Sequence, residues 1–214
     1  MKRIKDTFLH TLETAINIQG TNVLEIGCGE GTRSSEIAAR CRSLTGIEPN
    51  EDLVAKATAK DIRNAVFVKG SAELLEFEPQ RFDVVIFTLS FHHVPQTAMA
   101  AAIDEAVRVV TPDGHIVFLE PGANGSFFEA EIQFDACDGD EREEKRAAYE
   151  AMLAHTKLQL LCELPDETIF QFDSLGDFTE SMNPKGDVNA LEDFLTRHEY
   201  ILNAKRRINI FQPA

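Results

Sequence analysis

The sequence predicts an α/β fold with a doubly wound, mostly parallel sheet. Two observations predict it. Short apolar runs have the length of buried strands and alternate with helical patterns. The first run also passes directly into a glycine-rich turn and a helix, which is half of a βαβ unit. The expected strands are residues 23–26, 43–48, 65–69, 82–88 and 115–120, followed by two late strands at 167–172 and 206–211.

The turn after the first strand is the strongest local signal. Gly27, Gly29 and Gly31 permit positive φ and carry no β-carbon, so a ligand can lie directly against the main chain. A helix follows at once, and Thr32 or Ser34 can cap its N-terminus. This arrangement is typical of a loop that binds a nucleotide cofactor.

The helices are predicted from apolar residues at helical spacing. The first precedes the glycine turn, and a second of roughly ten residues opens at Asn50, a good N-cap residue. Thr111-Pro112-Asp113-Gly114 stops the helix over residues 98–110. The expected ranges, apart from the helix opened by Asn50, are 6–18, 98–110, 141–156, 175–182 and 188–198.

The spacing of the glycines separates two cofactor families. A dinucleotide fingerprint has the pattern Gly-x-Gly-x-x-Gly, and its third glycine would fall at Thr32. Residues 25–31 instead read Glu-Ile-Gly-Cys-Gly-Glu-Gly, which resembles the first motif of the class I S-adenosylmethionine-dependent methyltransferases. Glu48 ends the second strand, about 20 residues past the first glycine, where a carboxylate can accept both ribose hydroxyls in either family.

Two later stretches extend the resemblance. Residues 70–73 resemble the turn that lies against adenine, with Ser71 where an aspartate is common. The residues after the strand 82–88 resemble the segment that faces the sulfonium and the acceptor. The cofactor contacts that the resemblance implies are Glu25, near the methionine amino group, Gly27, Cys28, Gly29, Gly31, Glu48, Ser71, Ala72, Thr88 and Leu89.

The resemblance implies a seven-stranded sheet whose last strand is antiparallel. It also implies S-adenosylmethionine as methyl donor and S-adenosylhomocysteine as product. The acceptor is expected to be a small molecule. Two alternatives stay open: an NAD-binding oxidoreductase, and a catalytically silent protein that binds the cofactor or a partner.

His92 and His93 are the candidate catalytic residues. Histidine can take a proton near neutral pH, as a hydroxyl or amine acceptor would require. Paired histidines at this place also look like a recurrent feature of the family across chemically different members, so at least one is expected to be structural. The sequence slightly favours His92 as the base if one is used.

We expect residues 1–214 to form a single domain, with residues 123–165 as a helical cover over the acceptor site. This segment leaves the fifth strand at its carboxyl end, where ligands bind, and is longer than a simple connection. Phe127 and Phe128 supply apolar surface for an acceptor.

The charged part of the cover is predicted to stay in water. Residues 135–144 are too acidic to bury without partners. Arg142, Lys145 and Arg146 lie among these acids and are expected to pair with them locally. They are therefore not predicted to form a site for an anionic substrate.

Composition limits the partners. The chain has 36 acidic and 21 basic residues and a net charge of −15, which opposes binding to nucleic-acid phosphates. Its four cysteines form no Cys-x-x-Cys pair and no ligand cluster with histidine, so neither zinc nor a disulfide framework is expected. No apolar run approaches the roughly 18 residues of a membrane span, and residues after Lys2-Arg3 lack a signal core. A cytoplasmic protein is expected, and the oligomeric state is open.

Overall fold

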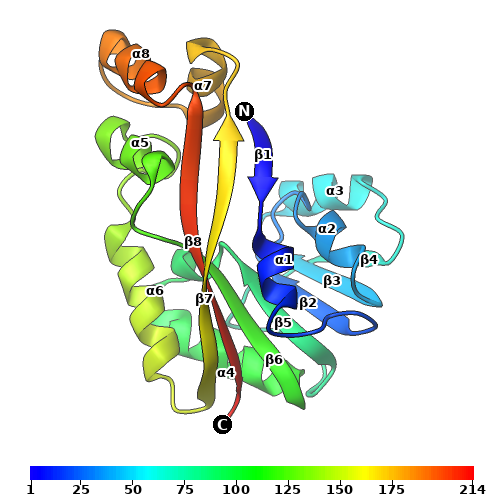
Figure 1. Cartoon of the computed structure of the whole chain (residues 1–214). Helices are drawn as coiled ribbons and strands as arrows, with labels where there is room; N and C mark the ends of the chain where they lie inside the picture. The colour runs from blue at the N-terminus through cyan, green and yellow to red at the C-terminus, as the bar shows by residue number, and fades with distance from the viewer.

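The computed structural model describes residues 1–214 and contains one eight-stranded sheet flanked by helices (Figure 1). The strands are β1 (Lys2–Asp6), β2 (Asn22–Ile26), β3 (Ser43–Glu48), β4 (Ala65–Lys69), β5 (Phe82–Thr88), β6 (Val110–Pro121), β7 (Leu158–Gln171) and β8 (Ile201–Pro213). Their order across the sheet is β1-β7-β8-β6-β5-β2-β3-β4.

Most of the sheet is parallel, as predicted. Strands β2 to β6 pair in parallel, β8 runs antiparallel to both β6 and β7, and β1 runs antiparallel to β7. The antiparallel last strand is confirmed, and β1 adds an eighth strand to the expected seven. Strands β3 and β4 extend the sheet to one side of β2, while β5 and β6 extend it to the other. The topological switch point therefore lies between the carboxyl ends of β2 and β5, where ligands bind in such sheets.

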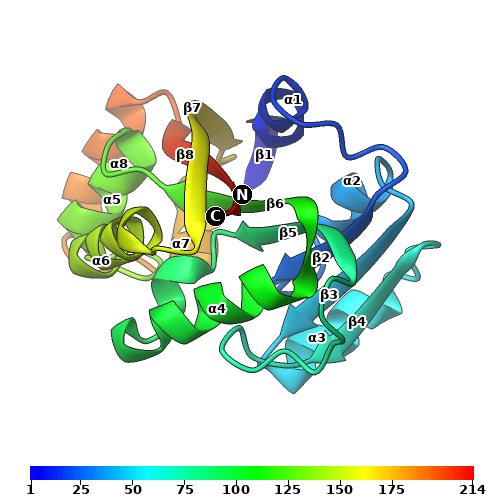
Figure 2. The ribbon, with the colours of Figure 1, turned by 90° about the horizontal axis from the view of Figure 1, so that it is seen from below.

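Helices cover both faces of the sheet (Figure 2). Buried side chains of α4 and α6 join one core cluster, and those of α1 and α2 join a second cluster on the opposite face. These helices are amphipathic, so burying their apolar stripes against the strands stabilises the layers. The helices are α1 (Phe8–Glu13), α2 (Ser34–Ala38), α3 (Glu51–Ala59), α4 (Met99–Val109), α5 (Ser126–Phe134), α6 (Arg142–Ala154), α7 (Leu175–Met182) and α8 (Val188–Arg197).

A third core lies apart from these two. The ends of β7 and β8 extend past the parallel strands and carry α5, α7 and α8 (Figure 1). We call this part the cap. Its ten buried core residues are Ala130, Phe134, Ala136, Phe172, Phe178, Met182, Leu191, Phe194, Leu195 and Leu202.

The predicted helix over residues 6–18 is wrong at both ends, because Asp6 belongs to β1 and residues 14–18 lie beyond the end of α1. Residues up to Asp6 form β1, and only Phe8–Glu13 is helical. Asp6 accepts hydrogen bonds from Arg206 at 2.7 Å and from Arg33 at 2.9 Å. These partners are distant in sequence, so tertiary pairing overrides the local helical pattern.

Further boundaries differ from prediction, and β6 begins at Val110 rather than at His115. Residues 158–165 belong to β7 and pair with β8, so the helical part of the predicted cover ends at Ala154. Both late strands are longer than predicted, because β7 and β8 form hydrogen bonds with each other along nearly their whole length. Neither Thr32 nor Ser34 caps α2, whose N-cap position is Arg33 without a side-chain hydrogen bond.

Other local predictions are confirmed. The side chain of Asn50 accepts hydrogen bonds from the N–H groups of Asp52 and Leu53 and so caps α3. The predicted bounds of β4, β5 and α7 match the structure. None of the helices combines the length and apolar composition that crossing a membrane requires.

Candidate active site

The glycine turn follows β2 at the switch point. Gly27, Gly29 and Gly31 have φ values of 75°, 54° and 76°. A β-carbon on Gly27 would lie 2.2 Å from Cβ of Ser90, so a larger residue does not fit there. The N–H of Gly27 donates to the carbonyl of Ile47 at 2.9 Å, which fastens the turn to β3. All three glycines have the positive φ that the sequence predicted, and Gly27 also brings the main chain close to a neighbouring element.

Glu48 is held against this turn. One carboxylate oxygen accepts from the N–H of Gly29 and the other from the N–H of Asn50, both at 3.1 Å. A carboxylate has about four acceptor positions. The two backbone bonds therefore fix its orientation and leave acceptor capacity for the two hydroxyls of a ribose.

A cleft of about 310 Å³ opens at the carboxyl ends of the parallel strands. It is large enough to enclose part of a nucleoside cofactor. Five of the ten predicted cofactor residues line it: Gly27, Glu48, Ser71, Ala72 and Leu89. Residues that were not among the predicted cofactor contacts complete the wall: Ile26, Ile47, Pro49, Gly70, Glu73, Ser90, the candidate catalytic residue His93, Val94 and Pro95.

Glu25 and Thr88 lie behind the cleft wall. The Glu25 side chain is fully buried and accepts hydrogen bonds from Ser34 at 2.5 Å and from Thr88 at 3.0 Å. Burial raises the pKa of Glu25 to about 7, although both hydroxyl donors work in the opposite direction. Thr88 therefore orients Glu25. It was predicted to contact the cofactor, but it does not line the cleft.

The remaining three predicted cofactor residues also lie outside the cleft lining. Gly29 and Gly31 shape the turn. Cys28 is buried, and its sulfur lies against Gly46 of β3. A β-carbon added to Gly46 would lie 3.0 Å from this sulfur. A direct contact of the Cys28 side chain with a ligand in the cleft is therefore not supported by its orientation.

A second cavity of about 210 Å³ adjoins the first. Leu89 and His93 line both, so they form the shared wall. Phe127 and Phe128, predicted to contact the acceptor, both line the second cavity. Its other lining residues are Arg33, His92, Pro121, Gly122, Asn124, Glu131, Cys137, Asp138, Glu141, Lys145, Thr168, Phe170, Ala204, Lys205 and Arg206.

His92 is buried and tightly held. Its Nδ1 lies 2.5 Å from a carboxylate oxygen of Glu120, which also accepts from the N–H groups of Phe91 at 3.0 Å and His92 at 3.3 Å. Glu120 thus satisfies the first N–H groups of the short 3₁₀ helix Phe91–His93. Burial alone would lower the pKa of His92, but the carboxylates of Glu120 and Glu141 outweigh it and raise that pKa.

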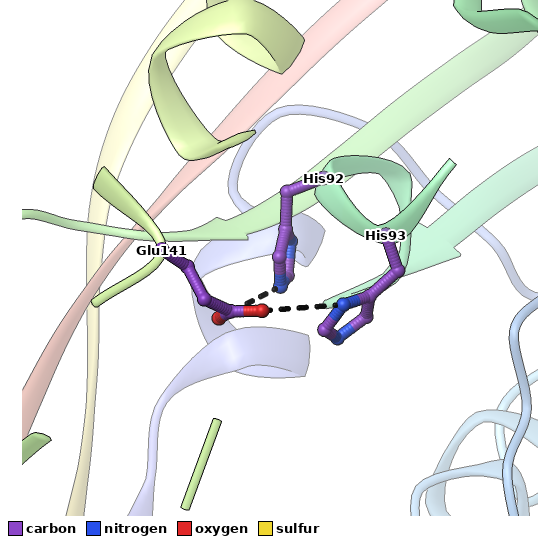
Figure 3. Close-up of side chains that lie close together, drawn as sticks. All are labelled: His92, His93 and Glu141. Carbon is purple, nitrogen blue, oxygen red and sulfur yellow. Dashed lines mark ion pairs between the residues drawn. The ribbon is translucent and has the colours of Figure 1, made fainter. Parts of the chain in front are cut away.

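His93 is half-exposed and faces Glu141 (Figure 3). Its Nδ1 lies 3.4 Å from one oxygen of Glu141, while Nε2 of His92 lies 3.8 Å from the other. Lys145 approaches the same carboxylate at 3.5 Å and also Glu131 at 3.4 Å. Helices α5 and α6 therefore reach the histidine pair through charged side chains.

The sequence interpretation missed Glu120, Glu141 and Lys145. The expected local pairing of Lys145 is confirmed by its ion pair with Glu141, but the side chain is buried and also pairs with Glu131 of α5. Its position three residues before Ala148, on the buried stripe of α6, is a signal that could have found it. Glu120 is an acid at the carboxyl end of a strand, also a readable signal. For Glu141 we find no local signal.

The fold and the site define a class before any comparison is made. A parallel sheet with a glycine turn at its switch point and an acid after the next strand forms a Rossmann-like nucleotide-binding site. Residues 23–114 match the family model described as a methyltransferase domain. This part of the chain is therefore similar to methyltransferase domains, in agreement with the resemblance of its first motif to the class I S-adenosylmethionine-dependent family.

Individual relatives agree. The chain is 31% identical over 128 residues to the phthiotriol/phenolphthiotriol dimycocerosates methyltransferase of Mycobacterium leprae, a match that covers 58% of this chain and 47% of that protein. The chain thus spans about half the length of the curated relatives it matches.

Solved structures match the fold along nearly the whole chain. A Bacillus halodurans methyltransferase structure has 17% identity, a TM-score of 0.65 and coverage of 96% of this chain and 98% of that one. A Methanosarcina mazei S-adenosylmethionine-dependent methyltransferase has 15% identity, a TM-score of 0.61 and coverage of 94% and 96%. At these identities the likeness concerns the fold.

Proposed function

We infer that the protein transfers a methyl group from S-adenosylmethionine to a small acceptor molecule and releases S-adenosylhomocysteine. The observation that carries this proposal is the shared wall of the two cavities. The cofactor cleft contains the glycine turn and Glu48, and the second cavity meets it at Leu89 and His93. A donor in one and an acceptor in the other would face each other there.

The cleft suits the cofactor in its charge and shape. Glu48 offers acceptors to the ribose hydroxyls, and Ser71 and Ala72 line the opposite part of the cleft for the adenine. Glu25 lies behind Gly27 as the acid expected near the methionine amino group. The sulfonium of S-adenosylmethionine supplies a methyl group that is already activated, so the protein must chiefly align the reactants and exclude water.

The second cavity favours a small, uncharged or weakly charged acceptor. Its volume of about 210 Å³ is below the usual range for drug-sized ligands. Its cations have acidic partners already: Arg206 pairs with Asp6 and Asp166, and Lys145 with Glu131. The net charge of −15 also disfavours nucleic acid as the acceptor.

A histidine of the pair His92 and His93 would accept the proton of a hydroxyl or thiol acceptor. His93 is favoured over His92 for contact with the acceptor, because His93 is half-exposed and lines both cavities. The buried ring of His92 is engaged by Glu120 and serves better as support. This reverses the slight preference that the sequence gave to His92.

The helical cover would choose the acceptor. Helices α5 and α6 contribute Phe127, Phe128 and Lys145 to the second cavity, and Glu141 precedes α6. These side chains belong to residues 123–165, the segment predicted to cover the acceptor site, and this supports the proposal that the segment selects the acceptor. Its helices close one side of the cavity, and residues 158–165 do not belong to it.

Ligand binding tests the cofactor assignment. S-adenosylhomocysteine should raise the melting temperature and NADH should not, since only a ligand of the native state stabilises it. Glu48→Ala should weaken S-adenosylhomocysteine binding by about 10- to 150-fold through loss of ~1.5–3 kcal/mol. Glu51→Ala is a matched control, because that exposed carboxylate pairs only with Lys69 at the surface.

Activity tests the reaction. Release of S-adenosylhomocysteine in a broad screen of small hydroxyl, thiol and amine acceptors is the expected result. Stabilisation by NADH alone would support an oxidoreductase instead. Binding of S-adenosylhomocysteine with no transfer to any acceptor would support a catalytically silent protein.

A further inference from the structure

The wall between the two cavities contains a compact group of metal-ligand atoms. One ligand atom each of His92, His93 and Glu141 lies within 4.8 Å of the other two (Figure 3). They come from the 3₁₀ helix after β5 and from the residue before α6. Two imidazoles and one carboxylate form a ligand set that suits Zn²⁺ and related ions.

The spacing is close to that of a coordination site. In a tetrahedral site with bonds near 2.1 Å, ligand atoms lie about 3.4 Å apart. The Glu141 carboxylate lies between the two rings, with one oxygen 3.4 Å from Nδ1 of His93 and the other 3.8 Å from Nε2 of His92. Small side-chain rotations would therefore bring all three atoms onto one ion.

Glu120 fixes the coordinating nitrogen of His92. It holds Nδ1 at 2.5 Å and is itself anchored by two backbone N–H groups. Nδ1 then carries the proton, and Nε2 is left free to coordinate. This carboxylate–histidine pairing is the usual outer-shell arrangement around metal-bound imidazole.

The charge balance around the three residues also favours a cation. The carboxylates of Glu120, Glu131 and Glu141 lie around this group and face one ammonium, that of Lys145, in a largely buried place. Buried charges need compensation. The ammonium of Lys145 lies between Glu131 at 3.4 Å and Glu141 at 3.5 Å and over the ring of Phe128 at 5.4 Å, so it compensates part of this negative charge and leaves the rest to a bound cation.

We propose that His92, His93 and Glu141 bind one divalent transition-metal ion of the Zn²⁺ type on the wall shared by the two cavities. Three protein ligands leave a tetrahedral ion one open position. That position faces the second cavity, where it would hold an acceptor through a hydroxyl or thiol group. The ion's role rests on the proposed function, whereas the site itself does not.

The test is a zinc titration of the full chain after treatment with a chelator and its removal. Zn²⁺ alone is the probe, and affinity is measured by competition with a chromogenic chelator. We expect one ion per chain. His93→Ala and Glu141→Ala should each weaken binding by at least about 100-fold, and Glu120→Gln by about 10- to 100-fold as an outer-shell change.

Matched controls separate this site from surface binding. His10→Ala and Glu143→Ala remove exposed side chains of the same types and should leave the affinity unchanged. His93 is half-exposed, so its variant should fold, and an unchanged melting temperature verifies this for each variant. Equal zinc affinity in wild type, His93→Ala and Glu141→Ala would overturn the proposal.

The outcome is independent of the proposed function. Zinc binding is measured without cofactor, and S-adenosylhomocysteine affinity is measured without zinc. A wild-type chain that binds S-adenosylhomocysteine but no zinc would contradict only the metal proposal. Zinc binding in a chain that binds no S-adenosylhomocysteine would contradict only the methyltransferase proposal.

Discussion

The two cavities that meet at Leu89 and His93 are built by different means. The cofactor cleft depends on main-chain geometry and on residues close in sequence to a strand end, such as Gly27 and Glu48. The second cavity depends on side chains brought together from the 3₁₀ helix, α5 and α6. Local sequence can specify the first kind of site, while only tertiary packing specifies the second.

The largest expected effect comes from the glycine turn. Gly27→Ala places a β-carbon 2.2 Å from Ser90 in a left-handed conformation, so it should destabilise the fold by about 2–5 kcal/mol and weaken S-adenosylhomocysteine binding. Gly20→Ala is the control, because its φ is 75° but no atom lies within 4 Å of the added carbon. It should cost only about 1–2 kcal/mol. Equal losses in chemical denaturation would show that steric fit at the turn does not matter.

The buried carboxyl group of Glu25, behind the cofactor cleft, should make stability depend on pH. The pKa of Glu25 is raised from 4.5 to about 7, so the folded state binds more protons than the unfolded state between these values. The free energy of unfolding should fall as pH rises from about 4.5 to about 7, by up to about 3 kcal/mol, and level off above. Glu25→Gln should lack this decline. Parallel urea denaturation curves for the two proteins across that pH range would contradict the assignment.

Replacing His92 and replacing His93 should affect stability differently, although both line the second cavity. His92→Ala leaves the buried Glu120 carboxylate without its side-chain partner and should cost about 1–3 kcal/mol. His93→Ala should change stability by less than about 0.5 kcal/mol, because that side chain is 51% exposed. Thermal melts of the two variants decide this, and identical midpoints would remove the structural role of His92.

The smallest expected effect concerns motion of the helical cover. Amide hydrogens of α5 and α6 should exchange faster than those of residues 84–87 in β5, because the helices are joined to the sheet through fewer buried contacts. S-adenosylhomocysteine, and more so an acceptor, should slow their exchange. Exchange as slow as in β5 and indifferent to ligand would mean that the cover is a fixed part of the fold.

The sequence predicted the parallel sheet well because its signals are local. The glycine turn, the Asn50 cap and the apolar run of β5 each report on a few neighbouring residues. The same reasoning failed for β1, whose strand conformation depends on pairing with Thr168–Gln171 at the other end of the chain.

The second cavity was predictable only in outline. Phe127 and Phe128 were found from their position after a strand end, whereas the burial of Lys145 depends on Glu131 fourteen residues earlier in a different helix. The supposed solvation of residues 135–144 failed at Glu141, whose carboxylate is largely enclosed by two histidines and a lysine. Such compensation is a property of the folded state and leaves no local pattern.

The antiparallel pair of β7 and β8 has a consequence for how specificity can change. The same two strands complete the main sheet at one end and carry the core of the cap at the other. The cap therefore cannot be exchanged as a module without cutting strands on which the whole protein depends. New acceptor preferences would be reached more readily by point substitutions on α5 and α6, which border the second cavity but supply no strand to the sheet.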